Sequence, residues 1–267
     1  MISLINLLQE YKKHLQTKVY CISFPKSGRT WLRAMIGKAL CEKYKLQDEL
    51  IFRPAALSKS AGILQSQWSH DGSANRDMHH WQDLKTTKRR YHNKKVLFLM
   101  RDPRDVVISC YFQATKRIRV FEGNISDFIR SPNFGIKKII IFNNIWLNNL
   151  EVPKESLLIR YEEMHENPAK TLREALRFLG AEKIQEEYIQ SAVDFSRFEN
   201  MKQLEEKALF DSKILKPGQS DDEESFKVRK GKVGGYFDYL SEADCHYLND
   251  ILDKEACPKL KNFYPAR

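Results

Sequence analysis

The octapeptide FPKSGRTW, residues 24–31, overlaps the end of an apolar run (residues 18–24) and leads into a stretch with helical spacing that extends to about residue 44. The β-branched and aromatic content of the first segment predicts a strand, and the periodicity of the second predicts a helix with Ser27 as its N-cap. Unpaired N–H groups at a helix start attract anions. Lysine, arginine and hydroxyl side chains crowd the same turn, so the sequence predicts a phosphate or sulfate cradle at residues 24–31.

This turn differs from the nucleotide-binding P-loop, GxxxxGK[ST], in which the lysine directly follows the second glycine. Here Lys26 precedes Gly28 by two positions, Arg29 and Thr30 follow the glycine, and the first P-loop glycine has no counterpart. Two alternatives stay open from the turn alone. One is a P-loop-type kinase that uses ATP and magnesium, and the other is a basic turn that only caps a helix.

Two further clusters combine basic residues with positions suited to anion binding. RDPRDVVIS, residues 101–109, begins where a second apolar run ends, and a helix that starts at Pro103 lets Arg101 and Ser109 face one anion. In FKVRKGKVGGY, residues 226–236, basic residues alternate with glycines, which allow a ligand to approach the backbone closely. Each cluster taken alone is compatible with an ordinary basic loop.

Strands and helices alternate along the rest of the chain. Strands are predicted at 18–24, 95–100 and 156–161, and helices at 2–15, 27–44, from 103 onward, 136–150, 168–180, 184–194 and 241–254. This alternation predicts an α/β fold, with a central parallel sheet flanked by helices in a P-loop-like topology and a single domain over residues 1–267. Ligands of such sheets bind at the carboxyl ends of the strands.

Two polar stretches interrupt the alternation and predict long loops. Residues 69–93 are rich in histidine, and residues 211–225 carry an acidic run beside Pro217 and Gly218. Loops of this length are often functional. The second stretch is a candidate lid that orders over a bound nucleotide.

The charge and the cysteine pattern favour some classes of protein and argue against others. The 267 residues carry a net charge of +10, from 45 basic and 35 acidic side chains, which favours polyanionic partners such as nucleic acid, a membrane surface or a phosphorylated ligand. Five cysteines without a CxxC pair indicate neither a disulfide scaffold nor a zinc site. The N-terminus lacks the features of a secretory signal, and no window approaches the ~20 apolar residues of a membrane span. These features predict a cytoplasmic protein.

Together, and in this order, the three basic clusters resemble the cytosolic-type sulfotransferases that use 3′-phosphoadenosine 5′-phosphosulfate (PAPS). That family carries a PKSGTTW-like phosphosulfate loop, an R-x7-S motif for the 3′-phosphate and a C-terminal RKGxxG segment. The corresponding segments here are PKSGRTW, Arg101 to Ser109, and RKGKVG, and RYEEMHENP at 160–168 is similar to the family's YEDM-type segment. The resemblance spans residue 19 to about residue 236.

The resemblance implies a donor site and its residues. The cofactor-binding set is Lys26, Ser27, Gly28, Arg29, Thr30, Trp31, Arg101, Ser109, Tyr161, Arg229, Lys230 and Gly231. In this set the loop at 26–30 holds the 5′-phosphosulfate, and Trp31 and Tyr161 flank the adenine. The remaining residues hold the 3′-phosphate. Arg29 departs from the family's usual threonine and places another cation near the sulfate.

The implied catalytic residues are Lys26, which contacts the bridging oxygen, and a histidine that acts as general base. The family's base follows a strand in a KTH-like setting, and QWSHDG places His70 there, with Trp68 in place of the lysine. His79 and His80 are rival candidates. A base with an ordinary histidine pKa predicts a rate that falls as the pH drops through about 6.5.

The resulting expectation is an enzyme that transfers a sulfuryl group from PAPS to a hydroxyl or amine and releases adenosine 3′,5′-bisphosphate (PAP), without a metal. The acceptor is expected to be a small molecule, a saccharide or a lipid, and not a nucleic acid. A nucleic-acid or anionic-surface binder is the non-enzymatic alternative, and steep salt dependence without PAPS binding would favour it. The sequence specifies neither the acceptor nor the oligomeric state.

Overall fold

A four-stranded parallel sheet lies at the centre of the computed structural model, which describes residues 4–210, 214–215 and 222–266. The strands are β1 (Val19–Ser23), β2 (Ser66–Ser69), β3 (Lys95–Met100) and β4 (Glu155–Arg160). They are arranged in the order β2-β1-β3-β4, and every pair is parallel. The predicted fold class, an α/β fold around a parallel sheet, is therefore confirmed.

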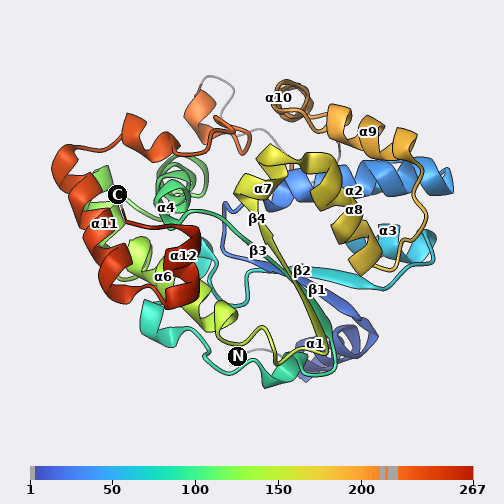
Figure 1. The fold of residues 1–267 in the computed structure, drawn as a ribbon, viewed down its shortest axis with the longest axis horizontal. Helices are drawn as coiled ribbons and strands as arrows, with labels where there is room; N and C mark the ends of the chain where they lie inside the picture. Colours follow the sequence, from blue (N-terminus) through green and yellow to red (C-terminus); the bar gives the residue numbers. More distant parts are fainter. Residues whose placement is uncertain (1–3, 211–213, 216–221, 267) are drawn as a thin grey trace.

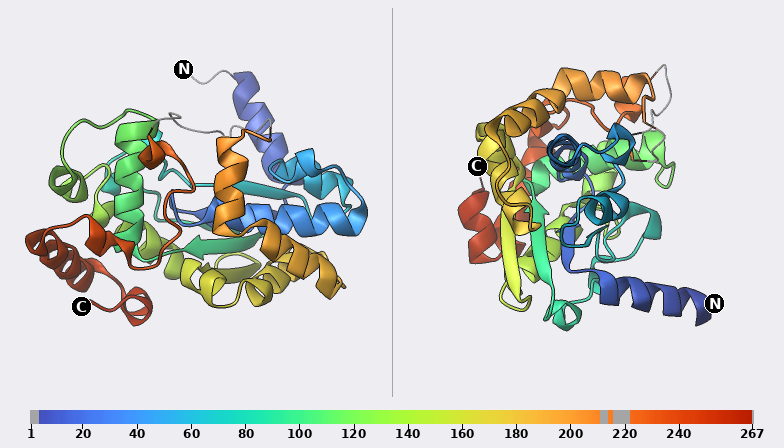
Figure 2. Two further views of the ribbon diagram at one scale, coloured as in Figure 1. Left: turned by 90° about the horizontal axis from the view of Figure 1, so that it is seen from above. Right: turned by 90° about the vertical axis from the view of Figure 1, so that its right-hand side faces the viewer.

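Helices cover both faces of this sheet (Figure 1). On one side lie α2 (Arg29–Tyr44), α3 (Pro54–Ser60), α8 (Pro168–Phe178) and α9 (Glu186–Phe195). The other side carries α4 (Pro103–Phe112), α5 (Ile125–Arg130), α6 (Ile136–Leu147), α11 (Glu242–Glu255) and α12 (Pro258–Phe263). The remaining α-helices are α1 (Leu4–Gln16), α7 (Tyr161–Glu166) and α10 (Phe198–Glu206). Figure 2 shows α1 projecting from the body of the molecule.

The core divides into two halves because neighbouring residues of a strand point to opposite faces. On β1, Tyr20 and Ile22 pack with α4 and α6, whereas Val19 and Cys21 pack with α2 and α8. All five residues of β1 are buried, as expected for a strand covered on both faces. The two apolar layers hold the sheet rigidly, and its carboxyl edge is therefore a fixed platform for loops.

That edge brings four distant parts of the chain together. The register pairs Ile22 with both Ser69 and Phe98, and Met100 with Arg160, so the four strands end side by side. β2 pairs with one side of β1, and β3 followed by β4 extends the sheet on the other side. The point where the strand order reverses is where α/β sheets form their binding crevice.

Several local details differ from the sequence-based expectations. Ser27 is not the N-cap of α2: that position is Gly28, whose φ of 95° and missing side chain leave the helix start open. The sequence shows only a short apolar stretch where β2 lies, because four residues are too few to show the alternation typical of a strand. Residues 69–93 contain three short 3-10 helices, at Asn75–Asp77, Trp81–Asp83 and Arg89–Tyr91. Most of the candidate lid at 211–225 lies outside the described residues.

Candidate active site

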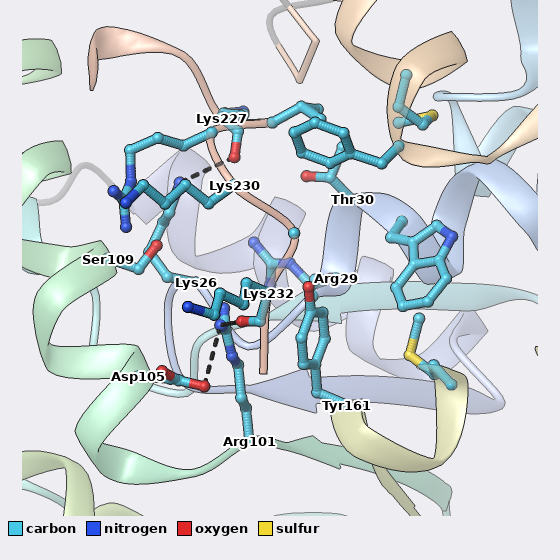
Figure 3. Close-up of a pocket in the computed structure, with 18 of the residues that line it drawn as sticks. Lys26, Arg29, Thr30, Arg101, Asp105, Ser109, Tyr161, Lys227, Lys230 and Lys232 are labelled. Carbon is cyan, nitrogen blue, oxygen red and sulfur yellow. Dashed lines mark hydrogen bonds and ion pairs between the residues drawn. The ribbon is translucent and has the colours of Figure 1, made fainter. Parts of the chain in front are cut away.

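A cavity of about 410 Å³ opens at the carboxyl edge of the sheet. Each strand contributes a side chain from the residues that directly follow it: Lys26 after β1, His70 after β2, Arg101 after β3 and Tyr161 after β4. The basic segment at 227–232 closes the cavity from the C-terminal part of the chain. Figure 3 shows Lys26, Arg29 and Arg101 gathered in this space, with Lys227 and Lys230 on the closing segment.

The turn after β1 has a backbone that ordinary side chains rarely adopt. Lys26 has a φ of 68°, and Gly28 has a φ of 95°. A Cβ atom on Gly28 would lie 2.4 Å from the Tyr161 ring, so only glycine lets the turn pack against this ring. The turn thereby exposes the N–H groups at the start of α2 to the cavity, which is the arrangement that binds anions.

Two lysines at this end of the cavity lack an ion pair among the described residues. Lys26 donates from Nζ to the Lys227 carbonyl at 3.4 Å, and Lys227 donates from Nζ to the Ile214 carbonyl. Burial is the main cause of the lowered pKa of Lys26, about 8, and of Lys227, about 7, and the charge of Arg117 acts on both in the same direction. An anionic ligand would compensate both charges and restore their protonation.

His70 is fixed by hydrogen bonds from both ring nitrogens. Its Nδ1 lies 2.8 Å from the Ser23 carbonyl, and its Nε2 lies 2.6 Å from Arg29 Nη2. Because a guanidinium can only donate, Nε2 carries the lone pair and Nδ1 carries the proton. Burial, followed by the charge of Arg29, lowers the pKa of His70 to about 3. The expected titration near 6.5 does not fit this environment, and His70 is neutral at physiological pH.

The rival histidines lie elsewhere. His79 is exposed, with Nδ1 3.4 Å from the Gly72 carbonyl, and His80 caps the short helix at Trp81–Asp83 with its side chain. Neither residue lines the cavity. Among the three candidates, His70 alone is positioned to contact a ligand in this cavity.

Aromatic side chains line part of the cavity. Trp31 and Tyr161 meet edge to face with ring centroids 5.7 Å apart, and Trp31 Nε1 donates to Ser196 Oγ at 3.2 Å. Phe198 also lines the cavity, and it lies so close to Gly231 that a Cβ there would be 2.5 Å from its ring. Aromatic rings of this kind suit contact with a planar base.

Arg101 is held in place by groups from three elements. Its guanidinium lies 4.2 Å above the Tyr161 ring, and Nη2 contacts Asp105 Oδ2 at 3.3 Å and donates to the Lys232 carbonyl at 2.8 Å. Its Nε is buried and has no partner among the described residues. Ser109, two turns into α4, also lines the cavity. Both residues of the R-x7-S spacing therefore line the same cavity.

Two buried carboxylates hold the closing segment. Glu205 accepts the backbone N–H groups of Lys227 and Val228, both at 2.9 Å, and Asp105 accepts those of Gly234 at 2.8 Å and Tyr236 at 3.1 Å. Glu205 is fully buried and also contacts Arg117 Nη1 at 3.2 Å. Segments more than a hundred residues apart are thereby joined around one cavity.

Three cations of the closing segment, Arg229, Lys230 and Lys232, are already paired with acids. Arg229 contacts Glu224 at 3.0 Å and the Tyr239 hydroxyl, and its guanidinium lies over the Phe112 ring at 4.4 Å. Lys230 and Lys232 contact Asp238 at 3.4 and 3.2 Å. These pairs fix the cations at the rim before any ligand arrives.

The cavity gathers every predicted site residue except Ser27, whose side chain is buried beneath the turn. Sequence reasoning missed Lys227, Asp105 and Phe198. Lys227 lies within the basic cluster at 226–236, and its place in that cluster is the feature of the sequence that could have identified it. Asp105 and Phe198 resemble ordinary helical residues, and no local pattern distinguishes them.

The described residues contain no group of three or more histidine, cysteine, aspartate or glutamate side chains that could hold a metal ion. None of the helices described here has the length and apolar character needed to cross a membrane.

Comparison with known proteins assigns the fold to a family. The family described as "Sulfotransferase domain" matches residues 16–263. Flavonol 3-sulfotransferase of Flaveria bidentis is 23% identical, over 92% of this chain and 84% of the relative. Cytosolic sulfotransferase 5 of Arabidopsis thaliana is 26% identical, over 90% and 79%.

Solved structures have the same fold at lower identity. A mouse sulfotransferase complexed with PAP matches with a TM-score of 0.61 and 17% identity, over 93% of this chain and 88% of the other. A retinol dehydratase in complex with androsterone and the inactive cofactor PAP matches with a TM-score of 0.63 and 17% identity, over 91% and 83%.

Proposed function

The chain belongs to the sulfotransferase domain family, and we propose that it transfers a sulfuryl group from PAPS to a hydroxyl or amine of a small acceptor. The observation that carries the proposal is the convergence of Lys26, His70, Arg101 and Tyr161, one from each strand end, on a single cavity. PAP is the second product. The whole of residues 1–267 is treated as one sulfotransferase domain.

The residues present fit this donor. A ligand with a 5′-phosphosulfate and a 3′-phosphate needs several cations, and the cavity is lined by Lys26, Arg29, Lys227, Arg101 and Arg229. Two buried nitrogens, Arg29 Nη1 and Arg101 Nε, have no partner among the described residues. Unsatisfied buried donors of this kind are completed by ligand oxygens. The aromatic side chains that line the cavity, Trp31, Tyr161 and Phe198, would hold the adenine.

His70 and Lys26 have complementary roles in the transfer. His70 Nε2 takes the proton of the acceptor, because Nδ1–H is held by the Ser23 carbonyl and Nε2 is the free base of that tautomer. Lys26 stabilises the negative charge that grows on the oxygen bridging sulfur and phosphorus. The aligned N–H groups at the start of α2 add to this stabilisation.

The site gives less information about the acceptor than about the donor. Two relatives are named for flavonols, and the retinol dehydratase structure holds androsterone. By analogy the acceptor is a small hydroxylated molecule, with saccharides and lipids included in the search. The relatives named cytosolic sulfotransferases support a cytoplasmic location for this chain.

The test is an acceptor screen with radiolabelled PAPS, followed by calorimetry with PAP and adenosine 5′-monophosphate. Transfer of label to an acceptor, with PAP bound much more tightly than the monophosphate, supports the proposal. Equal affinities would contradict the donor assignment. The kinase alternative would instead show magnesium-dependent turnover of ATP, and the family match argues against it.

A further inference from the structure

The side chain of Arg29 is hydrogen-bonded to His70 Nε2, the nitrogen that the proposed reaction needs as its base. Arg29 Nη2 lies 2.6 Å from His70 Nε2, and the Nδ1 of the same ring lies 2.8 Å from the Ser23 carbonyl. The imidazole is therefore saturated at both nitrogens. A base whose lone pair already accepts a hydrogen bond cannot accept a proton from a second donor until the first one leaves.

Arg29 itself is poorly satisfied where it lies. The described residues give its guanidinium no carboxylate partner, and its Nη1 is buried without any hydrogen-bond partner. Arg29 is the first residue of α2 and lies beside the turn that forms the anion cradle. It lines the same cavity as Lys26. A buried cation with an unused donor gains much from a nearby anionic oxygen.

We propose that Arg29 masks His70 until the donor binds, and that the sulfuryl oxygens of the donor then draw the guanidinium away from Nε2. This inference rests on the proposed function. Arg29 thus acts as a positioning residue that couples occupation of the donor site to the availability of the base. A threonine, the usual residue of this family here, has neither the charge nor the length to hold Nε2 in this way.

The step that follows balances without a further reactant. The acceptor oxygen forms a bond to sulfur while the bond between sulfur and the bridging oxygen breaks, and the electron pair stays on the 5′-phosphate of PAP. The acceptor proton moves to the unmasked Nε2 and gives an imidazolium. Arg29, now on the sulfuryl oxygens, stabilises the transferring group, and it returns to Nε2 after the products and the proton have left.

The test observes Nε2 directly by ¹⁵N NMR of protein labelled at histidine, with the His70 signals assigned by their loss in His70→Gln. In the free protein, Arg29→Gln should change the Nε2 signal and raise the pKa of His70 by roughly one pH unit, since a cation hydrogen-bonded to the ring is removed. PAPS should shift the wild-type Nε2 signal toward that of Arg29→Gln. PAP, which has no sulfuryl group, should leave it in place.

Arg33→Gln is the matched control. Arg33 lies one turn further along α2, is buried, and stacks on Trp68 at 4.6 Å, and its charge also acts on His70 without a hydrogen bond to it. Lys227 is the remaining cation that acts on the ring, and it is unchanged in both variants. Arg33→Gln should leave the Nε2 signal near its wild-type position, and Arg29→Lys should restore part of the masking.

Calorimetry on the same samples separates two kinds of failure. If PAPS binds but the Nε2 signal does not move, the masking proposal is wrong and the proposed function stands. The masking proposal would also be overturned if the Nε2 signal and the pKa of His70 were identical in the wild type and in Arg29→Gln. Failure of PAPS to bind at all would overturn the proposed function, and the masking with it.

Discussion

The cations of the cavity fall into two sets that differ in their partners. Lys26, Arg29 and Lys227 have no carboxylate partner among the described residues, and burial lowers the pKa of each. Arg101, in contrast, is paired with Asp105 at 3.3 Å, and Arg229 is paired with Glu224 at 3.0 Å.

This difference separates two tasks. A cation already paired with an acid is fixed in position but adds less attraction for a new anion, so it serves recognition of a group that does not react. An unpaired cation in a desolvated site acts strongly on charge that develops during a reaction. We therefore expect the unpaired cations to act on the transferring sulfuryl group and the paired cations to hold the 3′-phosphate.

The sharpest test of this division is His70→Gln. The variant should lose turnover by roughly 10²–10⁴-fold, the usual contribution of a positioned base, because no other group takes the acceptor proton. PAP affinity measured by calorimetry should be unchanged. With a pKa of about 3, wild-type His70 should produce no acidic limb in kcat/KM between pH 5 and 8.

His79→Gln and His80→Gln are the matched controls for this variant. Both lie outside the cavity and should keep full activity. A collapsed rate in either of them, with a normal rate for His70→Gln, would move the base to that residue.

Lys26→Ala should show the second-largest effect. Loss of a donor to developing charge typically costs about 10²–10³ in kcat. Affinity for PAP should fall less, because the N–H groups at the start of α2 and the other cations of the cavity also hold the 5′-phosphate, which keeps the bridging oxygen after the transfer. Steady-state kinetics and calorimetry give the two numbers. A variant with weakened PAP binding and an unchanged kcat would show that Lys26 serves binding alone.

Arg101→Gln tests the cations that are paired with carboxylates. It should weaken PAP by about 2 kcal/mol, or roughly 30-fold, as expected for a hydrogen bond to a charged group. Adenosine 5′-monophosphate should bind the variant and the wild type equally, because it has no 3′-phosphate. Equal losses for both nucleotides would mean that Arg101 supports the cavity as a whole.

The unpaired lysines also predict a pH dependence of PAP binding. Lys26 and Lys227 have lowered pKa values, about 8 and about 7, in the free protein, and a bound anion raises both. The complex therefore holds more protons, so affinity falls as the pH rises above these values, by up to about tenfold per pH unit for one proton. Calorimetry in buffers of different ionisation enthalpy should detect proton uptake at pH 8 and almost none at pH 6.

Lys227→Met refines this measurement. It should remove the uptake near pH 7.5 and leave that of Lys26 at higher pH. Affinity that stays constant from pH 6 to 9 would contradict the idea that these cations lie unpaired in the free protein.

Asp238→Asn should have the smallest effect. Asp238 pairs with Lys230 and Lys232 at the exposed rim, where screening by water and salt makes ion pairs weak. Its loss should strengthen PAP binding by less than about threefold, and only at low salt. A large gain would mean that the rim pairs compete with the ligand as strongly as buried ones.

The sequence predicts the α/β fold and most of the cavity because its motif residues directly follow strands, where parallel topology brings them together. It cannot predict the contact between Arg29 and His70, which are 41 positions apart and are brought together by the pairing of β1 with β2. The low pKa of His70 follows from that contact and from burial, and both are non-local. Lys227 lines the cavity where Glu205 holds its backbone N–H, and no local pattern reveals this contact.

The two carboxylates that hold the closing segment also have a consequence for protein synthesis. Glu205 and Asp105 are made before residues 227–236, and until those residues leave the ribosome the acids have no backbone N–H groups to accept. A product truncated before residue 226 contains all four strands and yet lacks the cations of the rim. The donor would then stabilise finished chains and not fragments, since a ligand protects only the species that binds it.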